Sequence, residues 1–438
     1  MRSNRGRWFL TGTGIVLASA VLLALVGCVS GKTYRTRFDT AALCTASSSE
    51  DCPGDILHVL ATDPVVRKPA LMSYVEFDDQ GYPREPQSKK LLIEELESLA
   101  NDHPLLLVVF AHGWKHNAAA GDTNVESFQS LLRKLAAADA AACTNAAHCR
   151  DRQVVGIYMG WRGLSNSLEP FKSLTFWARK GRAHRVGMDG GSELLAELSR
   201  LSRQKRARNH EGANRLVITG HSFGGALVYT ALSQALLRGM PLTPGEPISR
   251  DVANLIVLVN PAFEAARFES IHRKSQVAFA PGQKPVLAIF TSQGDKATEM
   301  AFPLGRKIAT LFSEHRDSRQ RAENVTAVGH YEPFQTHTLR VVEPSSISLR
   351  AAACAWEGFT RGDVNEWHVG ELVLRRTPEQ EQSVGRFSPY LNVAVDDAIV
   401  RGHNGIWEQT FADFLYYFVA AQEARSCATP VPVRPEGE

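Results

Sequence analysis

The sequence of 438 residues lacks the motifs that mark several large classes of protein. It contains no P-loop, no His-Glu-x-x-His helix and no dinucleotide-binding fingerprint after a strand. Its formal net charge of +3 is small and dispersed, which argues against a nucleic-acid partner. No pair of cysteines has Cys-x-x-Cys spacing, which argues against a zinc site. We therefore expect no cofactor, no metal and no nucleic acid.

After its first 27 residues the chain also lacks an apolar stretch long enough to span a bilayer. Three arginines precede an apolar run that ends in Leu-Val-Gly-Cys at 25–28, as in a secretory signal. Small residues before a cysteine resemble the lipobox of bacterial lipoproteins. The resemblance implies cleavage before Cys28, a diacylglyceryl group on its thiol, and an anchor in the bacterial envelope. Because Val29 follows rather than an aspartate, the outer membrane facing the periplasm is expected. An uncleaved anchor helix is the alternative.

The cysteines agree with export. Of the seven, six remain when Cys28 is set aside, and an even number suits an oxidising compartment. Six cysteines allow fifteen pairings, so the sequence does not determine the connectivity. Proximity along the chain suggests the disulfides Cys44–Cys52, Cys143–Cys149 and Cys354–Cys427.

Between residues 66 and 428, continuous apolar runs that are typical of buried strands alternate with segments that have apolar residues at helical spacing. This pattern predicts an α/β fold whose mostly parallel sheet is covered by helices on both faces. Residues 28–65 are expected to form a tether and an irregular segment, and 429–438 a disordered tail. The expected strands are 71–83 (an edge strand with its turn), 104–113, 153–161, 215–220, 254–263, 285–295 and 391–400, and the expected helices are 88–102, 125–142, 192–201, 224–237 and 407–424.

One short sequence, Gly220-His221-Ser222-Phe223-Gly224, separates an expected strand from an expected helix. Gly-x-Ser-x-Gly in this position is typical of a nucleophile elbow, a turn so tight that larger side chains at the two glycines would collide. The Ser222 hydroxyl should then project from the carboxyl end of the sheet, at the positive end of the following helix. A plain strand-to-helix turn is the alternative.

Roughly residues 66 to 425, which include this motif, resemble the α/β-hydrolase family, and the motifs follow one another in the order of that family. The resemblance implies an oxyanion hole made of two backbone N–H groups. One belongs to Phe223, the residue after the nucleophile, and the other to Trp114 in the His112-Gly113-Trp114 turn. We expect His112 to brace this turn rather than to titrate in catalysis.

The same resemblance implies a catalytic acid after a later strand and a base before the last helix. Asp295 follows the apolar run of 285–292, and His403 lies between Gly402 and Gly405 just before the C-terminal helix. The order Ser222, Asp295, His403 is the order of this fold. The competing candidates are Asp396 and Asp397 for the acid, and His330 and His337 for the base.

Four residues are candidates for lining a substrate pocket: His112, Gly113, Trp161 and Arg162. The basic and aromatic segment of about 162–190 lies where the family carries a lid, although a core-packed helix is the other interpretation. The interval of about 305–390 fits the alternation poorly and is expected to be an insertion over one end of the sheet.

These features together predict a membrane-tethered serine hydrolase that cleaves a small ester or lipid through an acyl-enzyme. The choice among lipase, thioesterase, amidase and acyltransferase stays open, because the triad does not select the acyl acceptor. The alternative from another class is a catalytically silent lipoprotein with a hydrolase fold that binds a partner. The oligomeric state does not follow from the sequence.

Overall fold

The computed structural model of the chain describes residues 31, 33–35, 56–60, 68–143, 152–164, 176–204, 214–343, 349–382 and 387–423. The expected signal (1–27), most of the expected tether (28–65) and the expected tail (429–438) lie outside these ranges. Within them, no helix combines the length and the apolar character that a membrane span requires.

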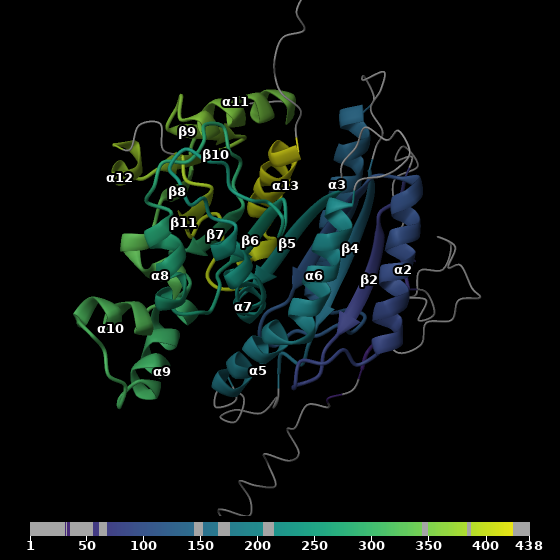
Figure 1. Cartoon of the computed structure of the whole chain (residues 1–438), viewed down its shortest axis with the longest axis horizontal. Helices are drawn as coiled ribbons and strands as arrows, with labels where there is room; N and C mark the ends of the chain where they lie inside the picture. The colour runs from purple at the N-terminus through teal and green to yellow at the C-terminus, as the bar shows by residue number, and fades with distance from the viewer. Residues whose placement is uncertain are drawn as a thin grey trace, which may run out of the picture.

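A sheet of eleven strands runs through the described ranges (Figure 1), in the order β1-β2-β4-β3-β5-β6-β7-β11-β8-β10-β9. Neighbours from β2 to β8 are parallel, and the antiparallel pairs lie at the two edges. The expected mostly parallel sheet is thus confirmed. The strands are β1 His58–Val59, β2 Leu71–Glu76, β3 Leu105–Ala111, β4 Gln153–Gly160, β5 Arg215–His221, β6 Leu255–Val259, β7 Leu287–Ser292, β8 His337–Val341, β9 Glu366–Val369, β10 Leu372–Arg376 and β11 Tyr390–Val395.

Strand β3 shows why continuous apolar runs become central strands. Leu107 and Val109 pack into the core on one face of the sheet, whereas Val108 and Phe110 pack into the core on the other. Successive side chains of a strand point to opposite faces, so a strand that is covered on both faces needs apolar residues at every position. The run of 104–113 predicted this double burial correctly.

Helices cover both faces. Those that contribute to the first core include α2, α6, α7 and α8, and those that contribute to the second include α3, α11 and α13. The helices are α2 Pro86–Asp102, α3 Thr123–Cys143, α5 Phe176–Met188, α6 Gly190–Arg203, α7 Phe223–Arg238, α8 Ala265–Lys274, α9 Phe302–Ala309, α10 Ser318–Val325, α11 Leu349–Arg361, α12 Pro378–Glu381 and α13 Gln409–Glu423, with the π-helical turn η1 Ala297–Ala301 and the 3-10 turns η2 Val328–His330, η3 Glu332–Phe334 and η4 Gly405–Trp407.

The second half of the expected lid is a packed helix. Helix α5 lies against α7, with Ala183 and Val186 buried between them. Gly187 is in such close contact that an added Cβ would lie 2.4 Å from the Leu227 carbonyl oxygen. Residues 176–188 thus form a core-packed helix, but Arg179 and Lys180 on it are buried rather than solvated, and residues 165–175 lie outside the described ranges.

The interval expected to be an insertion, 305–390, contributes β8, β9 and β10, which extend the sheet at one edge, beyond β11. The sequence did not indicate these strands, because they are short and two of them are antiparallel to their neighbours, so they lack the helix-strand alternation of parallel units. Helix α11 and Trp367 of β9 cover one face of this extension.

The predicted disulfide pairs remain predictions. Cys354 lies on α11 and is disulfide-bonded. The side chain of Cys143, at the end of α3, lies outside the described part of the chain, and so do the remaining cysteines, Cys28, Cys44, Cys52, Cys149 and Cys427.

Candidate active site

Ser222 occupies a strained turn between β5 and α7. Its φ of +55° and ψ of −119° are rare for a residue with a side chain. The turn needs both glycines, because an added Cβ would lie 2.8 Å from the Gly224 carbonyl oxygen at Gly220 and 2.0 Å from the Ala111 oxygen at Gly224. The Ser222 amide donates to the Val259 carbonyl at 3.0 Å, which ties the turn to β6.

The three residues expected to form a triad lie together, although they come from three distant parts of the chain. His403 Nε2 is 2.7 Å from Ser222 Oγ, and His403 Nδ1 is 2.8 Å from Asp295 Oδ2. Ser222 and Asp295 are fully buried, whereas the His403 side chain is 18% exposed. A neutral imidazole that donates from Nδ1 to the carboxylate accepts the serine hydrogen at Nε2, so this geometry suits proton transfer from Ser222.

The carboxylate of Asp295 is held by residues of the turn that follows it. Its Oδ1 accepts hydrogen bonds from the amides of Ala297 and Thr298, and its Oδ2 accepts the Thr298 hydroxyl at 2.5 Å. Burial alone raises the pKa of Asp295, but the hydrogen bond and charge of His403, followed by the bonds from Thr298, outweigh burial and lower it. The carboxylate is therefore ionised at neutral pH.

His330, the competing candidate for the base, lies behind the acid. Its Nε2 is 2.9 Å from Thr298 Oγ1, whose own hydrogen goes to Asp295. The Thr298 oxygen must then accept, so His330 Nε2 carries the hydrogen. Burial lowers the pKa of His330, which keeps the ring neutral at pH 7. His330 thus contacts the site through Thr298 and does not contact Ser222 in this arrangement.

The backbone of His403 is fixed by two side chains at the ends of neighbouring strands. His221 Nε2 donates to the His403 carbonyl at 2.9 Å, and Asn260 Nδ2 donates to the same oxygen at 2.9 Å. Asn260 also accepts the Ser292 amide at 2.9 Å through Oδ1. Burial lowers the pKa of His221 to about 3, so it is a neutral donor.

The turn expected to hold an oxyanion lies beside the serine. Gly113 is so near that an added Cβ would be 3.0 Å from Ser222 Cβ. His112 is fully buried: its Nδ1 donates to the Gly113 carbonyl at 2.9 Å, and its Nε2 accepts the Trp161 amide at 3.0 Å. Burial lowers the pKa of His112 to about 4. The expectation that His112 braces this turn agrees with these contacts, and its place in a substrate pocket does not.

Trp114 and Phe223 are the expected donors of this hole. Phe223 opens α7, where the first amides have no carbonyl partner within the helix. An aromatic cluster surrounds them, in which Phe176 of α5 is 5.1 Å from Trp114 and 4.6 Å from Phe223 between ring centroids. The surroundings of the serine on this side are therefore apolar.

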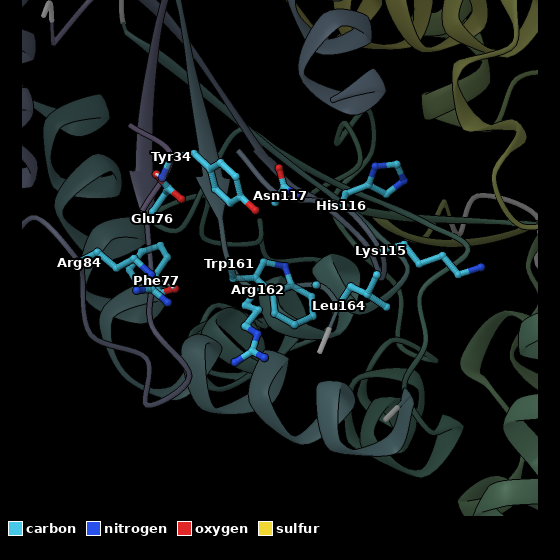
Figure 2. A pocket seen from close by; sticks show the side chains of 11 residues that line it. Tyr34, Glu76, Phe77, Arg84, Lys115, His116, Asn117, Trp161, Arg162 and Leu164 are labelled. Carbon is cyan, nitrogen blue, oxygen red and sulfur yellow. Dashed lines mark hydrogen bonds between the residues drawn. The ribbon is translucent and has the colours of Figure 1, made fainter. Parts of the chain in front are cut away.

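Trp161 and Arg162 were among the residues expected in a substrate pocket. They line instead a small cavity of about 50 Å³ that none of the three triad residues borders. In Figure 2, Glu76 and Arg84 lie on one side of Trp161, with Lys115 and His116 on the other. The Trp161 indole is 3% exposed and is stacked on His112, with ring planes 7° apart, so it mainly packs the turn.

The remaining competing candidates for the acid and the base do not belong to the triad, and each has other contacts. Asp397 Oδ1 accepts the Gly402 amide at 2.9 Å, which braces the loop that carries His403. Asp396 accepts the Ala398 amide within its own turn. His337 is buried on β8, where burial lowers its pKa to about 3.

Sequence reasoning overlooked Asn260 and Thr298. Asn260 directly follows a buried strand, with a φ of +46°, and the carboxyl ends of parallel strands meet at one edge of a sheet. That position was the available signal. Thr298 offered none, because a threonine three residues after an aspartate is common in turns.

A parallel sheet with a strained serine elbow, and a histidine and carboxylate supplied by later strand ends, defines a protein of the α/β-hydrolase class. The sequence agrees with the fold. Residues 195–330 match the family model described as "Alpha/beta hydrolase of unknown function (DUF900)". This matched part of the chain, which contains the serine elbow and Asp295, is similar to that family, and the sheet of the described residues has the α/β-hydrolase fold.

Two solved structures show distant similarity. The first is a Trichoderma reesei cutinase in complex with a phosphonate inhibitor, with 14% identity, a TM-score of 0.21, and coverage of 48% of this chain and 78% of that one. The second is an uncharacterised protein from Pseudomonas aeruginosa, with 12% identity, a TM-score of 0.21, and coverage of 55% of this chain and 41% of that one. Neither similarity informs the activity. No curated protein matches the chain.

Proposed function

We propose that this protein is a serine hydrolase that cleaves carboxylic esters through an acyl-enzyme, with Ser222, His403 and Asp295 as its catalytic triad. The observation that carries the proposal is the pair of hydrogen bonds, 2.7 and 2.8 Å long, that joins a serine on a strained elbow to a buried carboxylate through one imidazole. Burial, backbone strain and hydrogen bonding converge on one hydroxyl, which is the arrangement expected of an activated nucleophile.

In the proposed reaction, Ser222 Oγ attacks the ester carbonyl carbon and its proton moves to His403 Nε2. The oxyanion that forms is stabilised by the Trp114 and Phe223 amides, and such donors can each contribute about 3 kcal/mol in the transition state. His403 then gives the proton to the leaving alcohol as the carbonyl re-forms. Water, deprotonated by His403, attacks the acyl-enzyme and releases the acid and the free serine.

Asp295 supports both proton transfers. Its pKa is lowered, so it is ionised at neutral pH and stabilises the imidazolium that forms on His403. The bonds from Thr298 and the backbone amides hold the carboxylate in one orientation, which fixes the tautomer of His403. Asn260 and His221 position the histidine through its own backbone.

We also propose that the protein is attached to a membrane. The lipobox-like segment at 25–28 supports a lipid anchor on Cys28 in the bacterial envelope, facing the periplasm. An anchored hydrolase with aromatic side chains around its serine suits a small ester or a lipid. A Cys28→Ser variant should lose metabolic labelling with a fatty-acid probe, and a variant that kept the label would contradict the anchor.

The catalytic part of the proposal is tested with a fluorophosphonate probe on the full chain in detergent. Wild-type protein should be labelled, and Ser222→Ala and His403→Ala should not be. Ser318→Ala and His368→Ala, at exposed positions of α10 and β9, are the matched controls and should label like wild type. A folded wild-type protein that resists the probe and every ester in a short-to-long acyl series would favour the silent binding protein.

A further inference from the structure

Exposed apolar side chains are concentrated on one short segment. Met300, Leu304, Ile308 and Leu311 are 63–71% exposed, and Phe312 is 98% exposed. The first four lie at intervals of four, four and three residues, which places them on one face of η1, α9 and the following turn. These five are nearly half of the eleven exposed large hydrophobic side chains in the described ranges, and clusters of this kind mark interaction surfaces. We name these five side chains the α9 face.

The opposite side of α9 is firmly packed. Phe302 is fully buried, with its ring centroid 5.7 Å from that of Trp177 on α5. Gly305 lies flat against the same indole, where an added Cβ would have no room. Arg306 forms an ion pair with Glu264 at 3.0 Å. These contacts fix the inner side of α9. Leu304 and Ile308 lie on the opposite side of the helix and are therefore exposed.

The α9 face lies at the same end of the sheet as Ser222. Strand β7 ends at Ser292, Asp295 follows it, and η1 begins at Ala297. Figure 1 shows α9 and α5 projecting together at one end of the molecule, at the lower edge of the view, below α7. A surface that bound this end would lie close to the proposed catalytic serine.

Positive charge accompanies the α9 face. Of the six lysines and arginines between residues 296 and 321, three arginines are paired with carboxylates. Lys296 and Lys307 are exposed, and Lys307 lies one helical turn from both Leu304 and Leu311. Apolar side chains with cations at their rim suit a surface with an apolar interior and anionic headgroups.

We propose that the α9 face docks the protein onto an anionic lipid bilayer, so that the end of the sheet with Ser222 faces the membrane. The face is an amphipathic strip along η1, α9 and the following turn, which is the kind of surface that lies in a lipid interface. A second copy is disfavoured, because a twofold contact would bring the positive rim against itself. Docking does not depend on the proposed hydrolysis, whereas the delivery of membrane esters to Ser222 rests on it.

The docking is tested with the full chain in vesicles of phosphatidylglycerol and phosphatidylcholine that contain brominated acyl chains. Bromine quenches indoles that it contacts. The emission that Phe312→Trp adds to wild type should be quenched, and the emission that Val364→Trp adds should not, since Val364 is 48% exposed but lies between α11 and β9. Equal quenching at both positions, or none at 312, would overturn the proposal. A dimer in detergent that Ile308→Asp dissociates would assign the face to a second copy instead.

A second measurement links docking to turnover. Ile308→Asp should slow hydrolysis of an ester embedded in the vesicles by about tenfold or more, because a charge on this face opposes insertion. Leu242→Asp, at a 93% exposed position after α7, is the matched control and should keep the wild-type rate. A soluble short ester should be cleaved equally by both variants, and an equal loss on both esters would contradict docking. If wild type cleaves neither ester, the proposed function fails while the quenching result still decides the docking.

Discussion

Two buried polar clusters lie near the same end of the sheet and differ in how they are built. In the first, Glu264 accepts Lys180 of α5 at 2.7 Å and Arg306 of α9 at 3.0 Å. In the second, Asp295 contacts His403, and His403 contacts Ser222. The first cluster consists of ion pairs between α5, α9 and the residue that precedes α8. The second ends at a neutral hydroxyl, whose hydrogen can leave.

The difference shows that burial and ion pairing do not by themselves identify a catalytic group. Burial alone raises the pKa of Glu264, but Lys180 and then Arg306 outweigh it and lower the pKa, as His403 does for Asp295. Both carboxylates are ionised and nearly inaccessible. Only the second cluster contains a residue with a strained backbone, Ser222, and a histidine bonded to both a carboxylate and a hydroxyl. We therefore assign Glu264 to stability and Asp295 to chemistry.

The largest expected effect comes from the end of the second cluster. Ser222→Ala should reduce kcat/KM for an ester by at least about 10⁴-fold, because the nucleophile is lost. The free energy of unfolding should change by less than about 1 kcal/mol, since the alanine keeps the packing of Cβ. Ester kinetics and urea denaturation measure the two quantities. A variant that retained turnover would assign the chemistry elsewhere.

The first cluster should respond in the opposite way. Glu264→Gln removes the one anion that faces Lys180 and Arg306 in the described contacts, and breaking such a buried pair destabilises a protein by about 3–5 kcal/mol. The rate of fluorophosphonate labelling per folded molecule should stay at the wild-type value.

The control for this prediction is an exposed ion pair. Glu94 and Lys90 of α2 are 54% and 66% exposed, so Glu94→Gln should lower the free energy of unfolding by less than about 0.5 kcal/mol. Equal losses for Glu94→Gln and Glu264→Gln in urea denaturation would refute the structural role of the buried cluster.

A smaller effect on activity is expected behind the acid. Thr298→Val removes the hydroxyl that donates to Asp295 Oδ2 and accepts from His330. A less firmly oriented carboxylate should lower kcat by about 10- to 100-fold with little change in KM, because only the transition state forms an imidazolium. Thr360→Val, on α11, is the matched control, since its buried hydroxyl bonds only to the Glu357 carbonyl in the described contacts. Equal kcat values for the two variants would remove Thr298 from the site.

Much of the fold could be predicted from the sequence, because strands covered on both faces need continuous apolar runs and the elbow needs glycines at fixed positions. The apolar run around β3 fits a strand that is buried on both faces, and the Gly-x-Ser-x-Gly turn fits a nucleophile elbow. The extension by β8, β9 and β10 could not be predicted, because short antiparallel strands leave no such pattern.

The candidate site divides in the same way. Ser222, Asp295 and His403 could be placed because each follows a strand or precedes a helix in a recognisable order. The contacts of Thr298 and Asn260 could not, since they depend on how loops from separate strands meet. The exposure of the apolar side chains of α9 could not be predicted either, because amphipathic spacing alone does not show which face of a helix is packed.

The smallest predicted effect concerns the pH dependence of stability in the first cluster. His184 of α5 lies between Lys180, 3.1 Å away, and Arg267, 2.8 Å away, and burial followed by the charge of Lys180 lowers its pKa to about 2. In the unfolded chain a histidine binds a proton below about pH 6.5. The unfolded state therefore binds more protons than the folded state below that pH, and stability falls as the pH falls.

A His184→Gln variant separates this contribution from the rest of the chain, because glutamine keeps a hydrogen-bond acceptor but does not titrate. One histidine contributes a slope of about 1.4 kcal/mol per pH unit, so the variant should lose stability less steeply than wild type between pH 6 and 4. Urea denaturation across that range measures the slopes. His368→Gln, at an exposed position of β9, is the matched control for a histidine-to-glutamine substitution outside the cluster. If His184→Gln and wild type had equal slopes, His184 would bind protons equally in the folded and unfolded protein, and the neutral state assigned to it in the first cluster would be wrong.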